Sequence, residues 1–316
     1  MDKLRLGISS CLLGMPVRYD GGHKLDHYLR DTLGQYFEFV PICPEVECGL
    51  GVPREAVRLV GDAENPRLIT VRSKQDLTDR MAAWAAQRVG ELSTEQLCGF
   101  IFKSGSPSSG MERVKVYNEK GTAGKNGVGL FARVFMNHFP NLPAEEEGRL
   151  NDPILRENFI ERIFSCARWQ EIVRKKGLKL KDVMDFHTAN KLLILAHSPQ
   201  HYRELGRLVA GGKEMNIRDL ISVYERWFME GMKRKATPSK NANVLMHMVG
   251  YFKKELSAWE KGELLDLINQ YRMNVLPLIV PVTLLKHYVA KYDQSYLQGQ
   301  TYLNPHPLEL RLRNHV

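Results

Sequence analysis

The fourteen residues 42–55, with the sequence ICPEVECGLGVPRE, constrain the fold and chemistry of this chain more than any other stretch. Cys43 and Cys48 stand close enough in sequence to bind one metal centre, and Glu45 between them is a candidate acid or base. Two prolines and two glycines disfavour a regular helix or strand here, so the backbone is free to wrap around a ligand. The alternative is that both cysteines are small buried core residues, as in many intracellular proteins.

Length and composition predict a folded protein of two domains. With 316 residues, of which 43% are hydrophobic, the chain is long enough for two cores. The sequence has no basic segment followed by an apolar signal core and no run of about 18 uncharged apolar residues. We therefore expect a soluble cytoplasmic protein with no membrane contact. Its five cysteines, an odd number, argue against a disulfide framework and for reduced thiols that can bind metal.

The net charge of +9 lies entirely in the second half of the chain. Residues 1–150 hold 19 basic and 19 acidic side chains, whereas residues 151–316 hold 26 and 17. This asymmetry predicts that the second half binds a polyanion, and nucleic acid is the polyanion we expect. The alternative is a basic surface that only faces solvent.

Strand-like and helix-like segments alternate in the first half, which predicts an α/β domain with a mostly parallel sheet. Short apolar runs predict the strands, and an apolar period of about 3.6 residues predicts the helices. We place this domain at residues 1–145. The predicted strands cover residues 4–10, 37–42, 67–72 and 96–103, and the predicted helices cover residues 24–34 and 74–89.

Three of the predicted strands run directly into candidate site segments, namely Cys11, residues 43–48 and residues 104–110. Ligands of a parallel sheet bind beyond the carboxyl ends of the strands, so we expect these three segments to meet in one site. Cys98 lies inside a predicted strand and Cys166 in a predicted helix, and we interpret both as core residues.

The thiols of Cys11, Cys43 and Cys48 suit two kinds of metal centre. Zinc would take the three thiolates and a fourth ligand, such as Glu45 or water. An iron–sulfur cluster held by three cysteines would instead leave one iron without a protein ligand. Spacing alone does not distinguish these centres, and Cys11 as a simple strand-end thiol remains a third interpretation.

The second half of the chain is predicted to be all-helical, and we place its domain at residues 151–316. Residues 141–152 carry proline, glycine and a run of charges, which indicates a boundary, and Asp152 before Pro153 is typical of a helix start. We expect residues 292–316 to form an extended tail. The predicted helices cover residues 153–176, 180–196, 199–211, 215–234, 238–257, 260–273 and 277–291.

Basic side chains cluster in this second half with aromatic residues close to them. Because cations bind phosphates and aromatic rings stack on unpaired bases, the pattern predicts RNA binding. A helix-bundle core is the alternative for the aromatic rings. His197 and His201 stand four residues apart, but Pro199 between them disfavours a metal pair. The predicted RNA-binding residues are Arg174, Lys175, Lys176, Tyr202, Arg203 and Arg207.

Three motifs of the first half resemble those of the thiouracil desulfidase family, in matching order over residues 1 to about 140. They are SSCLLG and VRYDGGHK within residues 9–24, CPEVECGL at residues 43–50, and KSGSPSSG at residues 103–110. The resemblance implies a [4Fe-4S] cluster held by three cysteines, whose open iron captures the sulfur of a thiolated pyrimidine. It matches Cys11 and Cys43 to cluster ligands. It also matches Glu45 to the catalytic acid and Ser106 to the catalytic serine.

The chain departs from this family at one cluster ligand. The third cysteine of the family usually lies in the Ser-Pro-Ser-Cys-Gly loop, where this chain has Ser109. Cys48 stands instead where the family commonly has glycine. We expect Cys48 to restore the third thiolate from another side of the site, with Ser109 or solvent as the alternative ligand.

A second motif, AHSPQHYRELGRLV at residues 196–209, resembles the helical domain of bacterial tRNA 4-thiouridine desulfidases. The two resemblances together imply an enzyme that removes sulfur from 4-thiouridine in tRNA, with RNA affinity supplied by the helical domain. One alternative is a desulfidase of free thiouracil or thiouridine monophosphate. An alternative of another class is a non-catalytic RNA-binding protein with structural zinc. No obligate protein partner is inferred.

Overall fold

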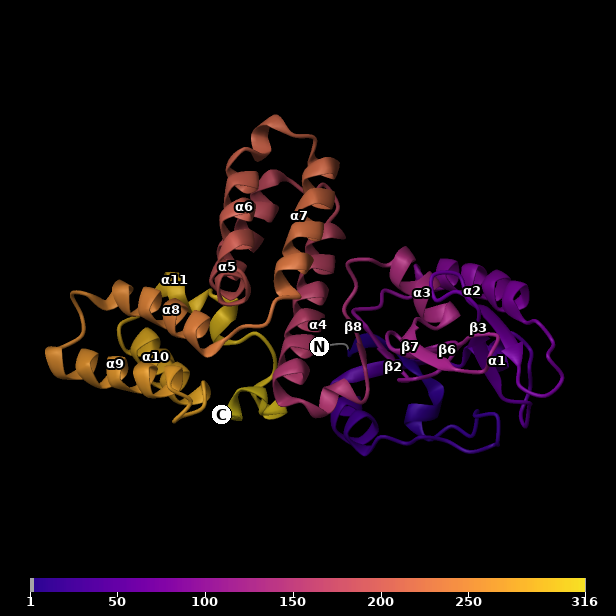
Figure 1. Ribbon diagram of the computed structural model, residues 1–316. Helices are drawn as coiled ribbons and strands as arrows, with labels where there is room; N and C mark the ends of the chain where they lie inside the picture. The colour runs from indigo at the N-terminus through magenta and orange to yellow at the C-terminus, as the bar shows by residue number, and fades with distance from the viewer. Residues whose placement is uncertain (1–2, 316) are drawn as a thin grey trace. The chain divides into compact units, whose positions relative to one another are not determined.

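The chain forms two compact units, residues 1–151 and 152–316, in a computed structural model that describes residues 3–315 (Figure 1). Residues 1, 2 and 316, which fall within the two predicted domains, lie outside the described part. The first unit is α/β and the second is built from helices, which confirms the predicted fold class. Among residues 3–315 we find no helix with the length and apolar character needed to cross a membrane.

The first unit contains a four-stranded parallel sheet in the order β2-β1-β5-β8. The chain passes from β1 to β2 on one side and then crosses to β5 on the other side of β1. This reversal of direction creates a topological switch point at the carboxyl end of β1, where open α/β sheets bind ligands. The strands are β1 (Leu4–Ser9), β2 (Phe37–Ile42), β5 (Phe100–Phe102) and β8 (Ala144–Glu146).

A second four-stranded sheet has the order β4-β3-β6-β7, with antiparallel outer pairs around a parallel central pair. Only β4 of this sheet was predicted. The strand β7 could not be predicted from its sequence, AGKNG, because it shows no alternation of apolar and polar residues. The strands are β3 (Val57–Val60), β4 (Arg67–Thr70), β6 (Val114–Tyr117) and β7 (Ala123–Gly127).

Helices α2 (Thr78–Leu92) and α3 (Leu130–His138) pack side by side and supply apolar residues to a core shared with β2 and β5 (Figure 1). Phe100 of β5 contacts Phe135 of α3 with ring centroids 4.7 Å apart. A Cβ at Gly7 of β1 would collide with the ring of Phe100, so glycine is required where β1 and β5 meet.

Local backbone geometry changes several predicted elements of the first unit. The predicted helix 24–34 is instead a π-helical turn, Tyr28–Thr32, followed by a 3-10 turn, Leu33–Gln35. The strand predicted from residue 96 begins only at Phe100, because Gln96 has a positive φ of 55° that a strand does not accommodate. Within residues 42–55 one short helix does form, α1 (Pro44–Glu47), with proline at its first position.

The regular elements among the described residues of the second unit are all helices. The predicted helices are found with ends shifted by a few residues, except that the helix predicted over residues 238–257 ends at Val249 and is followed by a 3-10 turn. Asp152 caps the first of them as predicted, since its side chain accepts hydrogen bonds from the backbone N–H groups of Ile154 and Leu155. The helices are α4 (Pro153–Val173), α5 (Leu180–His197), α6 (Pro199–Ala210), α7 (Ile217–Met232), α8 (Pro238–Val249), α9 (Ala258–Arg272) and α10 (Ile279–Lys291).

The prediction of an extended tail at residues 292–316 is wrong. This segment forms α11 (Ser295–Gln298) and three 3-10 turns, and it buries Leu297 and Tyr302 completely. The tail therefore belongs to the core of the second unit. Its helical turns are too short to produce a recognisable period in the sequence.

Candidate functional site

The carboxyl ends of β1, β2 and β5 converge on a cavity of about 250 Å³ in the first unit. Four residues predicted for the site line it together: Cys11, Cys43, Glu45 and Ser106. They lie up to 95 positions apart in the sequence and are brought together by the parallel strand order. Three cationic side chains, Arg18, Arg54 and Lys103, also line this cavity, which we name the thiol site.

Cys11 lies in the 3-10 turn Ser10–Leu13 that follows β1. The turn ends at Gly14, whose φ of 89° favours glycine, and the Cys11 carbonyl accepts a hydrogen bond from Lys24 N at 2.9 Å. Burial raises the pKa of the Cys11 thiol, while the positive charge of Lys103 opposes this effect.

Cys43 is the cap residue of α1, and its backbone N–H donates to the Glu47 carboxylate at 2.9 Å. The Cys43 thiol lies 3.6 Å from Glu45 Oε2 and 3.7 Å from the Val17 carbonyl oxygen. Burial, and then the charge of Glu45, raise the pKa of Cys43 to about 12. The thiolate of Cys43 therefore requires a positive centre beside it.

Glu45 is the central acid of the thiol site, and its side chain is 13% exposed. Its Oε1 accepts a hydrogen bond from Ser108 Oγ at 2.5 Å, while Oε2 lies 3.9 Å from Arg54 Nη2. Arg54 is itself fixed by donating to the Val17 carbonyl oxygen at 2.9 Å. Glu45 is thus held between a thiol, a hydroxyl and a guanidinium group.

The predicted catalytic serine, Ser106, reaches Glu45 through a second serine. Ser106 Oγ lies 3.0 Å from Ser108 Oγ, which contacts the Glu45 carboxylate directly. Ser108 is fully buried. Sequence reasoning placed Ser108 inside a family motif without a role, because only the direction of its side chain reveals the contact.

The loop that carries both serines is anchored to the start of α3. Gly129 N donates to Gly110 O at 2.8 Å, and Ala132 N donates to Ser108 O at 3.1 Å. A Cβ at Gly129 would lie 2.5 Å from the carbonyl carbon of Ser108, so a larger residue there would displace the loop.

Lys103 is a second site residue to which the sequence analysis gave no role. It follows β5, its Nζ forms an ion pair with Glu147, and it donates to the Ser104 carbonyl oxygen at 3.0 Å. Its position in the cavity wall places a positive charge near Cys11. This charge favours an anionic group in the thiol site.

Cys48 does not line the cavity with the other two predicted ligands. It ends α1, its thiol donates to the Glu45 carbonyl oxygen at 3.4 Å, and its side chain packs in an apolar cluster with Leu59, Met81 and Val116. Burial raises the pKa of this thiol too. Among the described residues, Cys11 and Cys43 are therefore the thiols that fit a metal centre in the cavity as they stand.

Cys98 and Cys166 are both buried, as predicted for core residues. Cys98 lies just before β5, and its backbone N–H donates to the Arg5 carbonyl oxygen at 2.9 Å. Neither cysteine lines the thiol site.

The predicted RNA-binding residues lie on two segments of the second unit. Arg174, Lys175 and Lys176 follow α4 and are exposed, although Lys175 forms an ion pair with Asp182 at 2.9 Å. Arg203 and Arg207 are exposed on α6, where Tyr202 is half-buried.

The other aromatic residues near these cations are largely core. Trp169 stacks on Tyr224 with ring centroids 4.9 Å apart, and Phe186 and Phe228 are buried beside them. His197 and His201 face different partners, with His197 Nε2 3.0 Å from Glu161 Oε2 and His201 Nδ1 2.8 Å from Ser198 Oγ.

Fold and site together define an α/β unit with a thiol-lined cavity, followed in the chain by a helical unit. Residues 6–147 match the model of the 2-thiouracil desulfurase family, and residues 191–307 match a family described as protein of unknown function (DUF1722). The chain therefore belongs to the 2-thiouracil desulfurase family, in a form fused to this second family, and is an enzyme of the desulfidase type.

Two bacterial relatives and one solved structure are similar to parts of the chain. The uncharacterized protein YbgA of Escherichia coli K12 is 34% identical over 154 residues, which are 48% of this chain and 90% of YbgA. The uncharacterized protein YbbK of Bacillus subtilis 168 is 30% identical over 108 residues, which are 33% of this chain and 71% of YbbK. The structure of a [4Fe-4S]-dependent thiouracil desulfidase, TudS, shares 30% identity over 48% of this chain and 95% of TudS, with a TM-score of 0.39.

Proposed function

We propose that this protein hydrolyses the thiocarbonyl of 4-thiouridine in tRNA. Water replaces sulfur at the pyrimidine carbon, so the products are uridine and sulfide and no electrons are consumed. The observation that carries the proposal is the thiol site, where Cys11, Cys43 and Glu45 meet in one cavity at the switch point of the sheet.

The thiol site holds two of the three cysteine ligands proposed for an iron–sulfur cluster. Cys11 and Cys43 supply two thiolates to one cavity, and Arg18 and Lys103 in its wall compensate an anionic group. We retain Cys48 as the proposed third ligand, which requires its thiol to turn away from the apolar cluster where it packs. Bound in this way, a cluster supplies a Lewis-acidic iron with affinity for sulfur.

Glu45 is the residue that moves protons in this proposal. Its carboxylate lines the cavity, so it can accept a proton from water that attacks the thiocarbonyl carbon. Ser108 holds Oε1 and leaves Oε2 on the side of Cys43. Ser106 extends this hydrogen-bond chain to the cavity, where it can position substrate or pass a proton.

The proposed tRNA substrate is supported by the distribution of charge rather than by a contact. The first half of the chain is neutral, and the second half carries the whole excess of +9. Exposed cations after α4 and on α6 are available to phosphates. Free thiouracil or thiouridine monophosphate is the alternative substrate, and non-catalytic RNA binding with zinc is the alternative of another class.

The test is to purify the chain without oxygen, measure iron and acid-labile sulfide, and then incubate it with thiolated tRNA and with thiouridine monophosphate. We expect bound iron, sulfide release and conversion of thiouridine in tRNA to uridine. Conversion of the free nucleotide alone would support the alternative substrate. A colourless zinc protein that binds RNA without releasing sulfide would overturn the proposal.

A further inference from the structure

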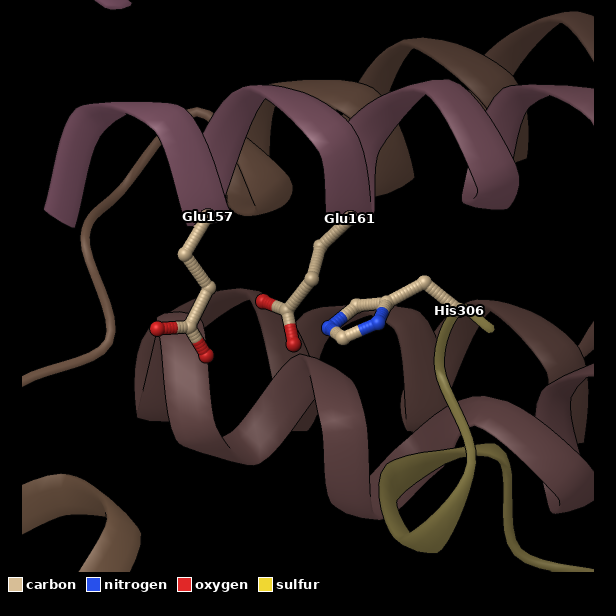
Figure 2. A group of neighbouring side chains, drawn as sticks. All are labelled: Glu157, Glu161 and His306. Atoms are coloured by element: carbon tan, nitrogen blue, oxygen red, sulfur yellow. The ribbon is translucent and has the colours of Figure 1, made fainter. Parts of the chain in front are cut away.

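Three side chains of the second unit with metal-ligand chemistry point toward one another, far in sequence from the thiol site. Glu157 and Glu161 lie one turn apart on α4, and His306 comes from the tail between Pro305 and Pro307 (Figure 2). One ligand atom of each residue lies within 4.8 Å of the other two. We name these three residues the carboxylate–histidine cluster.

The ring of His306 presents a buried nitrogen that has no hydrogen-bond partner. Its Nδ1 lies 3.1 Å from the Pro307 carbonyl oxygen, which only accepts hydrogen bonds, so the hydrogen-bond network assigns the proton of the neutral ring to Nδ1. Nε2 then carries a lone pair and is buried without a partner. Figure 2 shows one ring nitrogen of His306 directed at the Glu161 carboxylate.

A lone pair directed at a carboxylate is unfavourable unless a proton or a metal cation lies between the two groups, because both are acceptors. A backbone carbonyl that fixes the protonated nitrogen, and so leaves the other for a ligand bond, is the usual arrangement around metal-binding histidines. His306 therefore has the tautomer and the direction of a metal ligand.

Neighbouring side chains orient both carboxylates. Glu161 accepts a hydrogen bond from Arg313 Nη2 at 3.0 Å, and its Oε2 lies 3.0 Å from His197 Nε2. Glu157 Oε2 lies 2.6 Å from His315 Nε2. A carboxylate has about four lone-pair sites, so these contacts leave sites for a further partner.

The charge of the cluster also favours a cation. Arg313 is buried and pairs with both carboxylates, so its guanidinium compensates one of their two negative charges. His197 lies between the Arg234 carbonyl oxygen, 2.7 Å from its Nδ1, and the Glu161 carboxylate, 3.0 Å from its Nε2. A doubly protonated His197 compensates the second charge, whereas a neutral His197 leaves one negative charge on the two carboxylates. A cation would compensate this charge and bridge the two carboxylates to His306.

A cavity of about 80 Å³ opens beside the two carboxylates of the cluster, although His306 does not line it. Glu157 and Glu161 line this cavity together with Asn158 and Tyr271, so it has room for a few water molecules next to the carboxylates. An ion held by three protein ligands needs such water to complete its coordination.

We propose that Glu157, Glu161 and His306 bind one divalent metal cation through oxygen and nitrogen atoms. Two carboxylates and one imidazole suit Mn²⁺, Fe²⁺ or Zn²⁺ and offer no sulfur, in contrast to the thiol site. The ion links α4 to the C-terminal tail, and it is independent of the iron–sulfur centre of the proposed function.

The test uses Mn²⁺, because this ion prefers oxygen and nitrogen over thiolate and therefore avoids Cys11 and Cys43. The 316-residue protein is treated with a chelator and titrated with Mn²⁺, and the free ion is followed by electron paramagnetic resonance. We expect one site in the wild-type protein and a loss of affinity of roughly tenfold or more in the His306→Ala variant. Bound Mn²⁺ is also expected to raise the melting temperature of the wild-type protein but not of this variant.

The matched control is His247→Ala, which removes an exposed histidine of α8 and is expected to leave Mn²⁺ binding unchanged. Should His306→Ala fail to fold, Glu157→Gln removes one ligand charge while keeping the size of the side chain. A folded wild-type protein that binds no Mn²⁺, or ligand variants that bind it as well as the wild type, would overturn the proposal.

Discussion

The thiol site and the carboxylate–histidine cluster place metal-ligand side chains in the two units by different means. In the thiol site, parallel strands deliver their carboxyl ends to one edge of a sheet, and soft thiols come with them. In the cluster, one helical turn of α4 aligns two hard carboxylates, and a tail about 145 residues later adds an imidazole. The comparison teaches that the two folds gather donors of different softness, thiols in one unit and carboxylates with an imidazole in the other, which suit different kinds of ion.

Among the substitutions that test this comparison, Cys43→Ala is expected to have the largest effect on bound iron and on activity. This change removes a thiol that lines the cavity and lies 3.6 Å from the Glu45 carboxylate. We expect loss of bound iron and of detectable desulfidase activity, with Mn²⁺ binding by the second unit unchanged. Cys98→Ala is the control, because Cys98 is buried outside the cavity. Full iron content in Cys43→Ala would remove this residue from the ligand set.

Glu45→Gln is expected to separate binding of the iron–sulfur cluster from turnover of the substrate. The amide keeps the size of the side chain and the contact with Ser108 but cannot accept a proton from water. We expect iron content to stay near the wild-type value and kcat to fall roughly a hundredfold or more, the scale for a positioned acid or base. Normal turnover with intact iron would exclude Glu45 from proton transfer.

Ser108→Ala is expected to have a smaller effect on the same step. A hydrogen bond to a charged group contributes about 1.5–3 kcal/mol, so its loss is expected to lower kcat roughly ten- to a hundredfold. Ser106→Ala serves as the comparison, because Ser106 reaches Glu45 only through Ser108. A larger loss in Ser106→Ala than in Ser108→Ala would show that Ser106 contacts substrate directly.

The two sites also differ in how far the sequence could predict them. Cys43 and Glu45 are two positions apart, and the strand-to-loop pattern placed them with Cys11 at one edge of a sheet before the structure was known. The contact of Ser108 depends on the direction of a side chain, which no spacing reveals. His306 approaches α4 only because the tail folds into helical turns, and the sequence indicated an extended segment instead.

Backbone conformation limited the prediction of the fold in a similar way. The alternating pattern was enough for the parallel sheet, because β1 and β2 are six-residue apolar strands. The three-residue strand β8 lies below the length at which a pattern is reliable, and the strand predicted at residues 96–103 is longer than the three-residue β5 that forms within it. The positive φ of Gln96 has no signature in the residue type, because glutamine is not a residue that favours this conformation.

Cys48→Ala tests the proposed third cluster ligand, whose thiol does not line the thiol site. Since its thiol packs against Leu59 and Met81, the substitution is expected to lower the free energy of unfolding by about 1 kcal/mol. If the Cys48 thiol turns into the thiol site when an iron–sulfur cluster binds, the iron content of this variant is also expected to fall. Iron content equal to that of the wild type would leave Ser109 or solvent as the third ligand.

The smallest expected effect concerns the basic segment after α4 and leaves the chemistry untouched. Replacing Arg174, Lys175 and Lys176 with glutamine removes three exposed charges outside the thiol site. Each lost phosphate contact is expected to reduce the slope of log K against log salt by about one unit. Lys175 is expected to contribute least, because it already pairs with Asp182. The measurement is tRNA affinity at several salt concentrations.

Three lysines of the neutral first unit, Lys115, Lys120 and Lys125, provide the control for this experiment. All three are exposed, so their replacement changes the net charge of the chain by the same amount without altering the second unit. We expect this control to keep the salt slope, and both variants to keep the wild-type rate on thiouridine monophosphate. Equal loss of tRNA affinity in the two variants would mean that total charge, rather than the helical unit, attracts the RNA.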